Sequence, residues 1–194
     1  MLIVKMYATL LGPIIAGIIN SIFCSLKVCN KLKVPMDFNK KLKDGKRIFG
    51  DNKTWKGFLG YIVFNIIVAI LLGLLFNAIG KNHLNFFYVY HENTITYNLL
   101  IGFLLGLFYA LFELPNSFMK RRLNIKEGKS TKGFKKIFFI ILDQADSVFG
   151  VALVVWMFYP LGIMKYLLYI VIGVVTHLLI NMILYFLHLR KNMF

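Results

Sequence analysis

Two aspartates in the stretch LDQADSVFG lie three positions apart within a long apolar run. Asp143 and Asp146 would project from one face of a helix, because residues at i and i+3 are neighbours on a helix surface. A carboxylate at the centre of a bilayer costs several kcal/mol, and two on one face repel each other unless a cation lies between them. Mg²⁺ prefers oxygen ligands and keeps coordination positions for phosphate, and Mn²⁺ has similar preferences. We therefore expect a divalent-metal site; pairing of each aspartate with a loop cation, or a proton relay, would also explain the residues.

A second polar cluster, FELPNSFMKRR, closes another apolar run. Glu113 comes first, and Pro115 is expected to end or kink the helix that carries it. An amide, a hydroxyl and three cations follow at once, and such groups bind phosphate oxygens by charge and hydrogen bonding. We expect a phosphate site here, although a basic collar at a helix end would show the same cations. The polar side chains after the proline are Asn116, Ser117, Lys120, Arg121 and Arg122.

The stretch FGDNKTWKG precedes a third apolar run. Gly50 and Gly57 permit a tight backbone path, and Lys53 and Thr54 can hold phosphate oxygens. Trp55 can stack on a base or sugar, or anchor the chain at the membrane interface. The spacing is not that of a Walker A loop. Together the three clusters offer acids for a metal, cations for phosphates and an aromatic for a base, which suits a nucleotide and a phospholipid that meet at a membrane surface.

Long apolar runs must position these clusters. Of the 194 residues, 59% are hydrophobic, more than a soluble chain of this length could bury. Runs of about 20 apolar residues span a bilayer as helices. We predict an all-α integral membrane protein with five transmembrane helices in a single domain, 1–194. The expected spans are about 2–26, 58–79, 97–119, 137–159 and 161–189.

The placement of the basic residues predicts the orientation of these spans. The formal net charge is +15, which in a soluble protein would suggest a nucleic-acid partner. Here the segments 27–57 and 120–136 hold ten and eight of the 23 Lys and Arg residues, and two more follow the last span. Such an excess marks the cytoplasmic side. We expect both loops in the cytoplasm, the N-terminus outside, a multi-pass protein of the cell membrane with its site facing the cytoplasm, and no nucleic-acid partner.

Two further polar residues lie within the fifth span. His177 and Asn181 are four positions apart and would share one helix face. Such a pair is more often satisfied by hydrogen bonds between helices than used in chemistry. We therefore expect an interhelical role for both.

Three stretches resemble one family. PMDFNKKLKDGKRIFGDNKTWKG, from Pro35 to Gly57, looks like the first cytoplasmic loop of CDP-archaeol synthases. ELPNSFMKRRLNI, 113–125, resembles their second loop, and LDQADSVFG, 142–150, resembles their aspartate motif. The last two are also similar to the signature of CDP-diacylglycerol synthases. One departure is Asn39, where glycine is expected after Pro-x-Asp-Phe.

The resemblance implies a membrane-embedded CTP-dependent cytidylyltransferase of phospholipid biosynthesis. The phosphate of a lipid would attack the α-phosphorus of CTP, and pyrophosphate would leave. The implied ligands of Mg²⁺ are Asp143, Asp146 and Glu113. The cations implied to neutralise the triphosphate and the lipid phosphate are Lys53, Lys120, Arg121 and Arg122. The side chains implied to orient or bind the substrates are Asp51, Thr54, Trp55, Asn116 and Ser117.

An alternative from another class is a small ion or proton transporter that uses Asp143 and Asp146. It would explain the intramembrane acids, but not the cations, amide and aromatic on the same side. The sequence leaves the acceptor lipid open, since an archaeal diether glycerol phosphate, a phosphatidate-like lipid or a polyprenyl phosphate would fit apolar walls. It also leaves the oligomeric state open.

Overall fold

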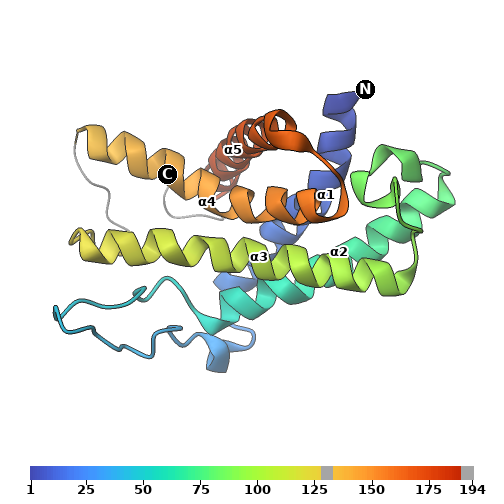
Figure 1. Ribbon diagram of the computed structural model, residues 1–194. Helices are drawn as coiled ribbons and strands as arrows, with labels where there is room; N and C mark the ends of the chain where they lie inside the picture. The colour runs from blue at the N-terminus through green and yellow to red at the C-terminus, as the bar shows by residue number, and fades with distance from the viewer. Residues whose placement is uncertain (128–132, 189–194) are drawn as a thin grey trace.

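Five long helices make up the part of the chain that the structure describes (Figure 1). The computed structural model describes residues 1–127 and 133–188. All five helices are long and apolar enough to cross a membrane, which confirms the predicted all-α fold. Within the described ranges the β-structure is limited to two isolated bridges. The helices are α1 (Leu2–Ser25), α2 (Trp55–Ala78), α3 (Ile95–Arg122), α4 (Phe134–Phe158) and α5 (Gly162–Phe186).

The helix bounds differ from the predicted spans mainly at the polar clusters. α2 begins at Trp55, earlier than predicted, because the Thr54 hydroxyl accepts a hydrogen bond from the Gly57 N–H (3.2 Å) and so caps the helix. α3 does not end at Pro115 but continues to Arg122. The predicted loop 120–136 and the predicted end of the fifth span at 189 lie partly outside the described residues.

Close approach of backbones joins α2 to α3. A Cβ atom added at Gly102 would lie 2.5 Å from Ile66 Cα, and one at Gly106 would lie 2.5 Å from Ile62 Cα. Two small residues four positions apart thus let the helices pack at short range, as in many membrane bundles. α4 is the most buried of the five spans, so the bundle is built around α3 and α4.

The connecting segments gather at the two ends of the bundle. The segment 26–54 lies beside the end of α3, at the lower left of Figure 1. The segment 79–94, with the short 3₁₀ turns η2 (Asn82–Leu84) and η3 (Phe86–Tyr88), lies at the opposite end. The first polar loop therefore meets the helix end that carries the second polar cluster.

Candidate active site

A single cavity of about 1010 Å³ brings the polar clusters together. It is lined by side chains from all five helices and from the loops 49–53 and 125–127. Its volume is at the upper end of the range that ligand pockets cover. One part of the wall is charged, and another, contributed by α1, α4 and α5, is apolar.

The two aspartates of α4 face the same point, as their spacing indicates. The amide nitrogen of Asn116 on α3 donates to Asp143 Oδ1 (2.7 Å) and to Asp146 Oδ2 (2.8 Å). Asp146 is buried, and its second oxygen accepts from the Ser147 N–H (2.7 Å). Asp143 also accepts hydrogen bonds from the Lys120 ammonium. One amide on α3 thus fixes two carboxylates on α4.

Three cationic side chains of the cavity that could bind phosphate are each paired with a carboxylate. Lys53 is bound by Glu113, Lys120 by Asp143, and Arg121 by Glu127. Burial disfavours the charged ammonium of Lys53, but the nearby carboxylates, Glu113 foremost, raise the pKa of Lys53 above its ordinary value. Lys53 is therefore a cation at neutral pH, and an incoming anion would have to exchange with Glu113.

The charge of the cavity is nearly balanced. Its described lining includes five Lys or Arg residues and four Asp or Glu residues. A triphosphate and a phosphate monoester together would bring several more negative charges than this wall neutralises. Additional cationic charge is therefore needed if both occupy the cavity. The charged lining residues are Lys53, Lys120, Arg121, Lys126, Lys136, Glu113, Glu127, Asp143 and Asp146.

The donor set around Asn116 fits Mg²⁺. Among residues 1–127 and 133–188, no three His, Cys, Asp or Glu side chains form a metal-binding group, so Glu113 does not join the two aspartates in one cluster. Mg²⁺, however, is usually held by one or two carboxylates, with water and phosphate as the other ligands. Asn116 Oδ1 is buried and has no hydrogen-bond partner in the described structure. The NH₂ of this amide faces the two carboxylates, and a turn of the amide would bring its oxygen to them as a further ligand.

The structure places the predicted site residues in two groups. Lys53, Glu113, Asn116, Ser117, Lys120, Arg121, Asp143 and Asp146 all line the cavity. Asp51, Thr54, Trp55 and Arg122 do not.

The four residues outside the cavity have other contacts. The Thr54 hydroxyl caps α2. Trp55 packs between aromatic rings, with its centroid 6.3 Å from that of Phe38 and 5.8 Å from that of Phe58. Asp51 forms an ion pair with Arg47 within the loop, and Arg122 at the end of α3 forms one with Asp44 of the loop.

Several lining residues had no predicted role in the chemistry. Phe49 and Asn52 come from the first loop, which has no periodicity to indicate which side chains face inward. Gln144 lies between the two aspartates, and its side chain accepts from Asn181 (2.6 Å) while its carbonyl contacts His177 (3.2 Å). The expected interhelical role of the α5 pair is confirmed, and both residues also line the cavity.

Comparison with known proteins identifies relatives. The family model described as CarS-like CDP-archaeol synthase matches residues 4–194. The CDP-archaeol synthase of Thermofilum pendens is 33% identical over 157 residues, which cover 80% of this chain and 64% of that protein. The CDP-archaeol synthase of Pyrococcus abyssi is 36% identical over 107 residues, 55% of this chain and 56% of that protein. These matches span less than two thirds of the relatives' own lengths.

A solved structure shares the fold. It is described as an intramembrane enzyme for archaeal membrane lipids biosynthesis. It superposes with a TM-score of 0.61 over 91% of this chain and 92% of that chain, at 22% sequence identity. The likeness therefore covers most of this chain and concerns its fold.

Proposed function

Because the chain belongs to the CDP-archaeol synthase family, we propose that it is a membrane-embedded CTP-dependent cytidylyltransferase. Its substrates would be CTP and a lipid phosphate, and its products a CDP-lipid and pyrophosphate. The observation that carries the proposal is the cavity in which Asn116 holds Asp143 and Asp146 together, beside three cations and an apolar wall.

The reaction needs positioning and charge neutralisation rather than a protein nucleophile. An oxygen of the lipid phosphate, already anionic near neutral pH, attacks the α-phosphorus of CTP. The bond from that phosphorus to the bridging oxygen of the β-phosphate breaks, and pyrophosphate leaves with the bonding electron pair. Catalysis of such transfers depends on alignment of the two phosphates and on neutralisation of their charge.

The cations of the cavity are suited to this task. Lys53, Lys120 and Arg121 would exchange their carboxylate partners for phosphate oxygens when the nucleotide binds. The carboxylates of Asp143 and Asp146, with the amide oxygen of Asn116, would then hold Mg²⁺. A bound Mg²⁺ supplies the additional positive charge that the nearly balanced cavity lacks.

The apolar wall suits the chains of a lipid. Ile14 and Ile18 on α1, Val148 and Val151 on α4, and Ile180 on α5 line the same cavity as the carboxylates. A lipid with its phosphate near Asp143 would lay its chains along this wall. We propose an archaeal diether glycerol phosphate as the acceptor, because the named relatives are CDP-archaeol synthases.

We propose that the site faces the cytoplasm, where CTP is made, and that the protein resides in the cell membrane. The support is the excess of basic residues in the segments near the cavity. The transporter alternative is not carried forward, since the family match concerns an enzyme.

The test uses CTP that is labelled in the cytosine ring. The purified protein, with Mg²⁺, should transfer the labelled cytidylyl group to a lipid phosphate. A panel of acceptors should include an archaeal diether glycerol phosphate, a phosphatidate and a polyprenyl phosphate. We expect labelled CDP-lipid, most rapidly with the diether. The absence of labelled lipid with every acceptor would overturn the proposed function, and faster reaction of another acceptor would overturn only the proposed lipid.

A further inference from the structure

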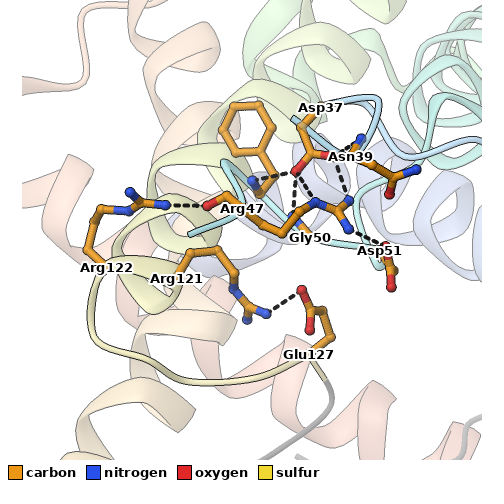
Figure 2. A network of polar contacts seen from close by, with 9 residues as sticks. Asp37, Asn39, Arg47, Gly50, Asp51, Arg121, Arg122 and Glu127 are labelled. Carbon is orange, nitrogen blue, oxygen red and sulfur yellow. Dashed lines mark hydrogen bonds and ion pairs between the residues drawn. The ribbon is translucent and has the colours of Figure 1, made fainter. Parts of the chain in front are cut away.

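A buried carboxylate outside the cavity organises the first polar loop. The side chain of Asp37 has no exposed surface and accepts five hydrogen bonds (Figure 2). Two come from the guanidinium of Arg47, at 2.6 and 3.2 Å. Three come from the backbone N–H groups of Asn39 (3.1 Å), Phe49 (3.0 Å) and Gly50 (3.0 Å). Burial opposes ionisation, but these hydrogen bonds hold the pKa of Asp37 well below its ordinary value.

The loop around Asp37 is closed upon itself. Its two ends are joined by hydrogen bonds from the Met36 N–H to the Lys53 carbonyl (2.8 Å) and from the Trp55 N–H to the Val34 carbonyl (3.0 Å). Within it, Asn39 has a φ of 63°, in the left-handed region. The segment is therefore a folded unit with a carboxylate at its centre, not an irregular linker between two spans.

The end of α3 holds this unit in place. Arg122 donates to the carbonyl of Arg47 (Figure 2). It also donates to the carboxylate of Asp44, while the ammonium of Lys46 donates to the Arg122 carbonyl (2.7 Å). α3 also carries Glu113, a wall residue of the cavity. The loop and the wall of the cavity thus share one support.

The unit presents its last residues to the cavity. Phe49, Asn52 and Lys53 line the cavity. The backbone N–H of Phe49 itself binds Asp37, and Asn52 and Lys53 follow shortly after Gly50, which does the same. A lysine side chain is long and flexible, so the place of its ammonium depends on where the backbone starts it. At Gly50, an added Cβ would lie 2.1 Å from a carboxylate oxygen of Glu127, which shows how closely this turn packs against the partner of Arg121.

We propose that Asp37 is a positioning residue that, with Arg47 and Arg122, fixes the backbone from which Lys53 reaches the phosphates of the nucleotide. We call these three residues the Asp37 clasp. The inference rests on the proposed function and adds to it residues outside the cavity that position Lys53. It also assigns Arg122 to holding the loop instead of binding phosphate.

The test is a double-mutant cycle in the full-length protein, with Asp37→Asn and Lys53→Ala singly and together. Asparagine keeps the shape of the aspartate but replaces one acceptor oxygen with an NH₂ group that faces backbone donors. We expect Asp37→Asn to lower kcat/KM for CTP by about tenfold or more in the wild-type background and by less than about threefold in the Lys53→Ala background, because residues that act through one another are not additive. A structural role alone would give the same loss in both backgrounds.

Two controls keep the result interpretable. Lys43→Ala removes an exposed lysine of the same loop and is expected to leave kcat/KM unchanged. Arg47→Lys keeps the positive charge but loses the planar fork, so it should show a smaller loss with the same dependence on Lys53. If Asp37→Asn fails to fold, the cycle of Arg47→Lys with Lys53→Ala decides the question.

The failures of the two proposals can be told apart. Wild-type protein that transfers no cytidylyl group overturns the proposed function, and this inference with it. Active wild-type protein in which Asp37→Asn is harmless, or equally harmful with and without Lys53, overturns the clasp alone.

Discussion

At the scale of single residues, the proposed site is a set of ion pairs that a bound nucleotide would have to open. The carboxylates that bind Lys53 and Lys120 in the described structure are also oxygen ligands suited to a metal. A nucleotide that draws the cations away would release the carboxylates at the same moment. Metal and nucleotide should therefore each favour the binding of the other.

Asp146→Asn tests the charge of the buried aspartate. The substitution keeps the volume of a side chain that Asn116 and the Ser147 N–H hold in place. It removes one of the two negative charges proposed to bind Mg²⁺, so the turnover of cytidylyl transfer should fall by about 10²-fold or more, as for other preorganised charges. Steady-state kinetics at limiting Mg²⁺ measure the effect. Glu92→Gln, in the segment at the far end of the bundle, is the matched control, and near wild-type turnover of Asp146→Asn would reject the assigned role.

Asn39 tests the backbone of the first loop. Its φ of 63° is a conformation that glycine adopts freely and that β-branched residues strongly avoid. We expect Asn39→Gly to leave the melting temperature of the purified protein nearly unchanged, whereas Asn39→Val should destabilise the protein by about 1–2 kcal/mol. A Val variant as stable as wild type would show that the loop does not need this turn.

Helical spacing predicted side-chain positions that loop sequence did not. Asp143 and Asp146 share a face, as do His177 and Asn181, because the helix period fixes the direction of each side chain. The stretch with Trp55 has no such period. Its residue types indicated a phosphate site, but Lys53 lines the cavity while Trp55 packs away from it, a distinction that depends on the turn around Asp37.

At the scale of elements, α3 is the support of the site. Its 28 residues make a helix of about 42 Å, longer than the ~30 Å hydrocarbon core of a bilayer. Pro115 was predicted to end or kink this helix, and the first of these is wrong, because α3 continues past it to Arg122. Loss of one backbone donor is tolerated in a membrane helix whose neighbours pack around it. The continuous helix carries Glu113, Asn116 and Lys120 on the cavity and Arg122 on the loop.

Gly106→Val tests the contact between α2 and α3. The added atoms would meet the backbone at Ile62, which cannot move aside as a flexible side chain can. We expect a loss of about 1–3 kcal/mol or more in stability, read as a lower melting temperature. Gly12→Ala is the control, because its Cβ would lie 3.8 Å from Leu72, an ordinary contact. Equal melting temperatures for the two variants would contradict the close packing described here.

At the scale of the whole molecule, the segments rich in basic residues and the charged part of the cavity lie at the same end of the bundle. The number of spans followed from apolar runs of sufficient length, because hydrogen bonding within each span is local. The apolar runs could not predict that the three polar clusters lie in one cavity, because that depends on which helices pack together. Gly102 and Gly106 have the small-residue spacing of packed membrane helices, but that spacing alone does not say which helix they meet.

The proposed orientation can be checked by labelling single cysteines in intact cells with a reagent that does not cross the membrane. In a background without Cys24 and Cys29, a cysteine at Asn82 should react from outside, and one at Asn52 should react only after the membrane is opened. The physical reason is the excess of Lys and Arg near Asn52. Labelling of Asn52 in intact cells would reverse the topology and place the cavity on the wrong side for CTP.

The most direct test of the central claim follows the two ends of the triphosphate separately. CTP labelled at the α-phosphate, or at the γ-phosphate, is incubated with Mg²⁺, an archaeal diether glycerol phosphate and the purified protein. The account predicts that the α-label enters the lipid while the γ-label is released as pyrophosphate, and that Asp146→Asn slows both by about 10²-fold or more. Transfer of the γ-label to the lipid, or release of pyrophosphate without any labelled lipid, would contradict it.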